Sequence, residues 1–345
     1  QGSAYVGLLD AFMDSKGAMT PEEFRGFCGN IVPLALFSRY CWSNDETFTA
    51  QLKISNFSDK ALSNESLHWR LQDTSTKEIL SSGSIGDIDV AQGGLSEVGK
   101  IEVPFKEIDQ AASLRLVLNM GAYTNGYDLW VYPENQDGSS DPDMEETTSL
   151  QHALEMLAQG KKVLYSPLQT EITPLSVGGL FTPDYWNYAM FKSISEHLGR
   201  EVSPGTLSLL TDPLHPLFRE FPTEMHSNWQ WWVIAKKSRP FILDGVPKAY
   251  KPLIQVIDNI ERNHKLGLLF EMRVGTGKLL VNMCDMEAIA DKPEGRQYRR
   301  ALLQYISSTE FSPDTEFTPE ELSALFTTTV EEKEIVGVKN ITTYQ

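Results

Sequence analysis

The sequence is short of cysteine, of basic residues and of long apolar runs, and each shortage excludes a class of protein. Three cysteines, Cys28, Cys41 and Cys284, are too few for a disulfide scaffold, and none belongs to a CxxC metal-binding pair. Only 30 lysines and arginines stand against 47 aspartates and glutamates, and the net charge of −17 disfavours nucleic acid and anionic membranes as partners. No apolar run approaches the roughly 18 residues of a membrane-spanning helix. With 345 residues, 41% of them hydrophobic, the chain is long enough for two or three folded domains.

Motifs of the common catalytic kinds are missing as well. The chain contains no GxSxG or GxCxG nucleophile elbow, no GxGxxG or P-loop motif and no HExxH metal motif. Cys284 follows an apolar strand without small flanking residues, so we expect a buried structural thiol. Gly178 and Gly179 offer backbone N–H groups to an anion, although a plain loop is the simpler interpretation. The histidines lack metal-site spacing, and 47 acidic residues make close carboxylate pairs unavoidable. We therefore assign no catalytic residue, no metal site and no cofactor.

The period of the hydrophobic pattern changes once along the chain. Between residues 39 and 133, short strands recur about every ten residues, and the run from Phe48 to Ile54 alternates apolar with polar side chains. This pattern predicts an immunoglobulin-like β-sandwich at 39–133. At 149–312, helical spacing alternates with short apolar strands, which predicts a three-layer α/β domain.

Three shorter segments join or flank these two domains. Residues 134–148, which begin "ENQDGSSDPDMEE", have almost no apolar side chains and predict a linker. Residues 1–38 open without an initiator methionine on a mostly apolar run, and Thr20 caps a predicted helix, so we expect a piece cut from a longer chain. Residues 313–345 predict one short capped helix within a C-terminal tail.

The stretch "HSNWQWW" holds three of the chain's seven tryptophans. In one interpretation the indoles lie beneath sugar rings and the polar side chains bind hydroxyl groups; the carbohydrate-binding candidates are then His226, Asn228, Trp229, Gln230, Trp231 and Trp232. In the other, Trp229 and Trp231 alternate inward on a strand while Trp232 covers a domain contact, because large aromatic residues dominate cores and interfaces. The residues by themselves favour the second interpretation and leave the first open.

Longer stretches of the sequence resemble a known family. "QGSAYVGLLDAFMDSKG" with "TPEEFRGFCGNIVPLALFSRYCWSNDETF" resembles the end of the catalytic barrel of glycoside hydrolase family 2, in its large β-galactosidase-like members from Bacteroides-type bacteria. "FTAQLKISNFSDKAL", "LHWRLQD" and "ILSSGSI" resemble the β-sandwich that follows this barrel. "DPLHPLFREFPTEMHSNWQWW" and "QVIDNIERNHKLGLLFEMRVGTGKLLV" are similar to the C-terminal domain of the same proteins, which has a class I glutamine-amidotransferase-like fold.

The resemblance implies that the parent protein is a retaining glycosidase whose catalytic glutamates lie in the barrel, ahead of this chain. Neither glutamate maps to a position here, and the amidotransferase-like domain lacks the catalytic cysteine of that fold. The implied function is a non-catalytic C-terminal accessory region that supports the barrel, the active-site rim or subunit assembly. The alternative is a carbohydrate-binding module centred on Trp229–Trp232, and an independent hydrolase in the α/β domain is the least favoured.

The resemblance also sets the expected surroundings of the chain. Its expected partners are the catalytic barrel of the parent chain, a glycan or oligosaccharide, and a second copy in a homo-oligomer. Such bacterial enzymes act in the periplasm or outside the cell, so a periplasmic or secreted location is expected.

Overall fold

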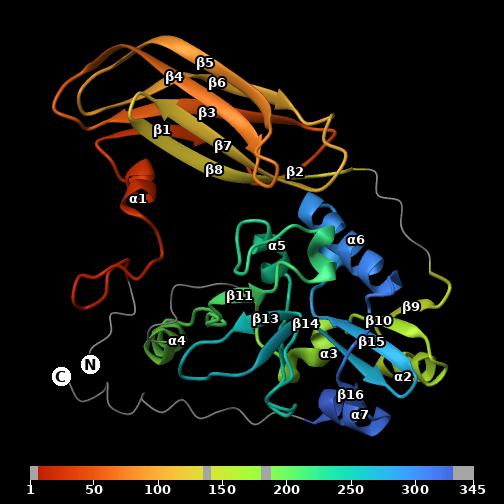
Figure 1. Cartoon of the computed structure of the whole chain (residues 1–345). Coiled ribbons are helices and arrows are strands. Elements are labelled where there is room, and N and C mark those ends of the chain that lie inside the picture. Colours follow the sequence, from red (N-terminus) through yellow and green to blue (C-terminus); the bar gives the residue numbers. More distant parts are fainter. Residues whose placement is uncertain (1–6, 135–140, 180–187, 329–345) are drawn as a thin grey trace, which may run out of the picture. The chain divides into compact units, whose positions relative to one another are not determined.

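Several β-sheets and a smaller number of helices make this a multidomain, mostly β protein (Figure 1). The structure is a computed structural model that describes residues 7–134, 141–179 and 188–328. Residues 1–6 of the predicted first segment, residues 135–140 of the predicted linker, residues 180–187 of the predicted α/β domain and residues 329–345 of the predicted tail lie outside the described residues. By its internal contacts the chain divides into two units, Gln1–Asn135 and Gln136–Gln345.

The described residues of the first unit form one helix and two sheets. Helix α1 spans Pro21–Phe27, and the strands of the unit are β1 Ile31–Leu36, β2 Cys41–Ser43, β3 Thr47–Asn56, β4 Leu62–Asp73, β5 Ile79–Val90, β6 Gly94–Pro104, β7 Ala112–Met120 and β8 Tyr123–Tyr132. One sheet has the order β1-β3-β6 and the other the order β2-β8-β7-β4-β5. Most neighbouring strands are antiparallel, and the pairing of β2 with β8 is parallel.

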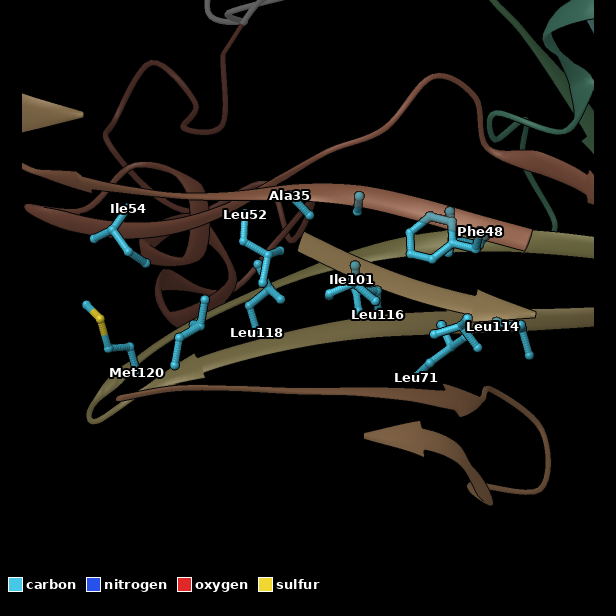
Figure 2. Packing of buried hydrophobic residues seen from close by; sticks show 14 of the residues in the cluster. Ala35, Phe48, Leu52, Ile54, Leu71, Ile101, Leu114, Leu116, Leu118 and Met120 are labelled. Carbon is cyan, nitrogen blue, oxygen red and sulfur yellow. The ribbon is translucent and has the colours of Figure 1, made fainter. Parts of the chain in front are cut away.

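A single hydrophobic core joins the two sheets. The alternation read in the sequence is present in β3, where Phe48 and Ile54 are both fully buried on one face. These side chains lie in the same cluster as Leu71 of β4 and Leu116 of β7, which belong to the other sheet (Figure 2). Because the core draws on both sheets, the first unit consists of two packed β-layers.

The capped helix predicted near the start of the chain is confirmed. Thr20 Oγ1 accepts from the backbone N–H of Glu23 (3.2 Å), and the Glu23 carboxylate accepts from the backbone N–H of Thr20 (2.7 Å). Of the apolar run ahead of this helix, the described part holds an isolated bridge between Leu9 and Ser15, and Phe12 is 78% exposed.

The second unit is built around an eight-stranded mixed sheet of order β11-β13-β14-β15-β10-β9, with β12 and β16 pairing β14. Its strands are β9 Met144–Thr147, β10 Lys162–Tyr165, β11 Ser208–Thr211, β12 Phe241–Ile242, β13 Ile254–Ile257, β14 Leu266–Val274, β15 Gly277–Asn282 and β16 Glu316–Phe317. Its helices are α2 Leu150–Ala158, α3 Gln169–Ile172, α4 Tyr188–His197, α5 Trp231–Lys236, α6 Pro293–Ser307 and α7 Pro319–Thr327, with short 3-10 turns at η1 Thr173–Leu175, η3 Pro216–Arg219 and η4 Glu287–Ile289.

Strand β9 lies in the range that the sequence assigns to a linker. Met144–Thr147 pairs in parallel with β10 at the edge of the sheet. An edge strand is held by backbone hydrogen bonds on one side and needs few buried side chains, so its polar sequence gave no strand signal. Strands β14 and β15 form an antiparallel hairpin, with Gly275 at its turn in the left-handed region at φ 59°.

Helices lie on both faces of this sheet. Tyr165 of β10 shares a core with Leu157 of α2 and Phe326 of α7. Lys162 lies three residues before Tyr165 on the same strand, and its side chain therefore points to the opposite face of the sheet. There its Nζ donates to the carbonyl oxygen of Ser307 at the end of α6 (3.2 Å). The second unit therefore has a helical layer on each side of the sheet.

Candidate functional site

Trp231 anchors the tryptophan-rich stretch in the core of the second unit. Its side chain is fully buried, its Nε1 donates to Thr223 Oγ1 (2.8 Å), and its ring packs edge-on against Tyr298 of α6 (6.0 Å between centroids). The neighbouring Gln230 is also fully buried, and its Nε2 donates to the carbonyl oxygen of Pro222 (2.9 Å). These two candidate residues therefore hold the stretch in place and present no surface to a ligand.

The strand interpretation of this stretch is wrong, because the backbone turns and then enters helix α5. The Asn228 carbonyl accepts from the N–H of Trp231 (3.2 Å), and the Trp229 carbonyl accepts from the N–H of Trp232 (3.2 Å). Consecutive residues on such turns point about 100° apart, so Trp231 faces the core while Trp229 and Trp232 face outward.

Trp229 and Trp232 form an exposed pair of indoles, which we call the tryptophan pair. Their side chains are 53% and 40% exposed. The ring centroids are 6.1 Å apart and the ring planes are inclined by 56°. A spacing of three residues across a turn brings them side by side, in the same way that residues three apart are neighbours on a helix.

Polar side chains flank the tryptophan pair in the sequence and at the surface. The Nδ2 of Asn228 donates to the carboxylate of Glu224. His226 is exposed, and its backbone forms a bridge with Leu210, next to strand β11. An amide, a carboxylate and an imidazole, all within five residues of Trp229 in the sequence, can donate to and accept from hydroxyl groups. Of the six sequence candidates, four have side chains that are at least partly exposed, and these are His226, Asn228, Trp229 and Trp232.

Cys284 is not a nucleophile in this fold. It is 3% exposed, and its thiol lies 3.6 Å from the carbonyl oxygen of Ile234, to which it donates. Burial raises the pKa of the Cys284 thiol to about 12, so the thiolate is not populated near neutral pH. This agrees with the expectation of a structural cysteine.

Cysteine labelling tests this assignment. Cys28 is exposed, whereas Cys41 and Cys284 are buried. We expect iodoacetamide at pH 8 to modify Cys28 alone in the folded chain and all three cysteines in 6 M guanidinium, as read by intact mass. A second thiol that reacts in the folded chain as fast as Cys28 would contradict the burial of Cys284 or Cys41, and peptide mapping would identify which.

The paired glycines do not form an anion nest at Gly179. Its backbone N–H already donates to the carbonyl oxygen of Ser238 (3.1 Å). A Cβ atom at this position would lie 2.5 Å from the carbonyl oxygen of Ala235, so glycine is needed for close packing of two backbone segments.

Within the described residues, no three histidine, cysteine, aspartate or glutamate side chains gather in a way that would hold a metal ion. None of the described helices has both the length and the apolar character that crossing a bilayer requires.

These features define a mostly β protein with a two-sheet unit, a mixed-sheet unit covered by helices on both faces, and an exposed tryptophan pair. The chain belongs to the family described as Domain of unknown function (DUF8487), whose model matches residues 145–327, more than half of the chain. A second model, Domain of unknown function (DUF8488), matches residues 46–133. No curated protein matches the chain.

Similar solved structures share only small parts with this chain. A beta-glucosidase from Listeria innocua is 13% identical over 30% of this chain and 16% of its own length, with a TM-score of 0.24. The CARDB domain of the PF1109 protein from Pyrococcus furiosus is 5% identical over 30% of this chain and 93% of its own, with a TM-score of 0.22. A cycloisomaltooligosaccharide glucanotransferase from Paenibacillus sp. is 8% identical over 38% of this chain and 19% of its own, with a TM-score of 0.24. At these TM-scores the likenesses carry no argument about function.

Proposed function

We propose that this chain is a non-catalytic accessory region of a β-galactosidase-like glycoside hydrolase of family 2. The sequence resemblance supports this role, since the stretches that carry it run from the first residues to strand β15. In this proposal the first unit is an immunoglobulin-like sandwich, and the second is an amidotransferase-like α/β domain. The region packs against the catalytic barrel of its parent, shapes the active-site rim or joins subunits, and the parent acts in the periplasm or outside the cell.

The burial of Cys284 supports the non-catalytic part of this proposal. A hydrolase that used the α/β domain by itself would need a nucleophile within hydrogen-bond reach of a base. Cys284, which follows strand β15, is enclosed by backbone and lacks the thiolate form. The proposal therefore predicts no turnover of glycosides by this chain alone.

The tryptophan pair favours a second function for the same region, which is carbohydrate binding. The apolar face of a pyranose ring matches the face of an exposed indole, while flanking amides and carboxylates bind its hydroxyl groups. Two indoles inclined by 56° cannot both lie flat on one crystalline surface. Each can cover one ring of a twisted chain, so a soluble oligosaccharide is the ligand that this geometry fits.

Alanine variants of the tryptophan pair test this function. We expect Trp229→Ala and Trp232→Ala each to weaken binding of soluble galacto-oligosaccharides about tenfold, because covering roughly 60 Å² of apolar surface contributes about 1.5 kcal/mol. Isothermal titration calorimetry gives the dissociation constants. Ile260→Ala, which truncates another exposed apolar side chain of the second unit, is the matched control and should bind as the unaltered chain does.

Two outcomes would contradict carbohydrate binding by the tryptophan pair. One is that the unaltered chain binds none of the oligosaccharides at millimolar concentration. The other is that both tryptophan variants bind as tightly as Ile260→Ala.

A further inference from the structure

Arg239 occupies a rigid position beside the end of strand β15. Its backbone N–H donates to the carbonyl oxygen of Met283, the residue that follows the strand (3.0 Å). The next residue, Pro240, accepts from the N–H of Val177 (2.9 Å). Backbone hydrogen bonds to two neighbouring segments therefore hold the main chain at Arg239 in place, and its side chain extends from this fixed position.

One side of the Arg239 guanidinium is also fixed. Its Nε donates to Ser176 Oγ (3.1 Å), and that hydroxyl in turn donates to the carbonyl oxygen of Ile172 (2.6 Å). Ser176 is only 9% exposed. Among the described residues, neither terminal nitrogen of Arg239 takes part in a hydrogen bond or ion pair.

Arg239 is a half-buried cation that forms no ion pair among the described residues. Two other partly buried cations have acidic partners: Arg262 pairs with Asp258, and Lys162 with Asp141 (3.0 Å). Arg239 has none among the described residues, although the chain carries 47 acidic residues. Burial alone lowers the pKa of the guanidinium, with no neighbouring carboxylate to offset it, and the group still stays charged near neutral pH.

Two exposed lysines precede Arg239 in the sequence, and Asp285 lies beside the same segment, with its backbone N–H donating to the carbonyl oxygen of Lys237 (2.9 Å). Arg239 ends the sequence "KKSR", in which Lys236 and Lys237 are both exposed. Neither lysine forms an ion pair within the described part of the chain. Three cations thus lie within four residues of a chain whose net charge is −17.

The position in the sheet is one where ligands bind in other α/β proteins. Strands β10 and β15 are parallel and end at the same edge, where Asn282 Nδ2 donates to Ser166 Oγ (3.2 Å). Gln169, just after β10, donates to the carbonyl oxygen of Lys237 at this edge (2.7 Å). Ligands of open α/β sheets bind outside the carboxyl ends of the strands.

We propose that Arg239 binds an anionic group that presents two oxygens to its terminal nitrogens. The planar guanidinium donates two parallel hydrogen bonds to a carboxylate or to a tetrahedral oxyanion such as sulfate or phosphate. In a glycan, these groups correspond to a uronic acid or to a sulfate or phosphate ester. Lys236 and Lys237 attract the anion by their charge. This site is separate from the tryptophan pair, and its argument stands without the proposed function.

Calorimetric titration of the full chain at constant ionic strength tests the site. The probes are D-glucuronate, inorganic sulfate and inorganic phosphate, with D-glucose as the neutral control. We expect one saturable site for at least one anion, with the affinity reduced at least about tenfold in Arg239→Gln, which removes the charge and the paired donors. Arg239→Lys keeps the positive charge but lacks the two parallel donors of the guanidinium, and it should bind with intermediate affinity. Arg273→Gln, an exposed arginine of β14 paired with Glu316, is the matched control.

The pattern of binding identifies the ligand class. Binding of glucuronate without sulfate or phosphate would assign a carboxylate ligand, and the reverse would assign a tetrahedral oxyanion. The proposal is overturned if no anion binds saturably to the unaltered chain. It is equally overturned if Arg239→Gln, shown by circular dichroism to be folded, binds as tightly as Arg273→Gln.

Discussion

We expect Trp231→Ala to lower the free energy of unfolding of the second unit by about 3–5 kcal/mol, the usual cost of removing a large aromatic side chain from a core. Trp231 is fully buried and packs edge-on against Phe221 (5.0 Å between centroids) and Tyr298. The substitution also leaves Thr223 Oγ1 without the donor that now binds it at 2.8 Å. Loss of volume and of this hydrogen bond act in the same direction.

Urea unfolding followed by circular dichroism measures this effect, with Trp232→Ala as the control. Trp232 is 40% exposed and stands one residue away, so its truncation should change the free energy of unfolding by less than about 1 kcal/mol. Equal losses in the two variants would contradict the assignment of Trp231 to the core and Trp232 to the surface.

The second large effect is expected at Asp258. Its side chain is 1% exposed, and its carboxylate accepts from the Nε of Arg262 (3.0 Å) and the backbone N–H groups of Asn259 and His264 (both 2.9 Å). Asp258→Ala leaves a mostly buried guanidinium and two backbone donors without their acceptor. Breaking a buried pair in this way costs about 3–5 kcal/mol.

Two companion variants separate this buried pair from ordinary surface pairs. Glu316→Ala removes an exposed partner, that of Arg273, and should cost no more than about 1 kcal/mol. The double variant Asp258→Leu with Arg262→Met should recover part of the loss, because no charge is left buried alone. If Asp258→Ala cost as little as Glu316→Ala in urea unfolding, the network around Asp258 would not stabilise the fold.

The sequence predicted those helices and strands that are determined by residues close together in the chain. The strand from Phe48 to Ile54 follows from alternation, and the caps at Thr20 and Thr318 follow from a hydroxyl placed three residues ahead of a glutamate. Strand β9 could not be found in this way, because Met144–Thr147 is a strand only through pairing with β10, which lies elsewhere in the sequence.

The candidate site was likewise predicted only in those features that depend on neighbouring residues. Composition was enough to select the stretch "HSNWQWW", but it could not separate buried from exposed indoles. That separation depends on the turn that starts α5 and on Tyr298, which is distant in sequence and receives Trp231. The i, i+3 spacing of Trp229 and Trp232 was the signal that could have indicated an exposed face.

Arg239 was missed for a related reason. The run "KKSR" is visible in the sequence, but a basic run normally forms a solvated surface. What the sequence does not show is that the Nε of Arg239 donates to Ser176 while its terminal nitrogens form no ion pair within the described residues. Both features depend on contacts between Arg239 and segments that are distant from it in the sequence.

The central claim is that this region serves a glycoside hydrolase without cleaving glycosides itself, and its most direct test is hydrolysis of a nitrophenyl glycoside panel. The panel includes galactosides, the chain is used at high concentration, and product release is followed across the fractions of a size-exclusion column. We expect no release above the buffer rate in the fractions that contain the chain. Turnover that co-elutes with the chain would place a catalytic pair within these residues and contradict the claim.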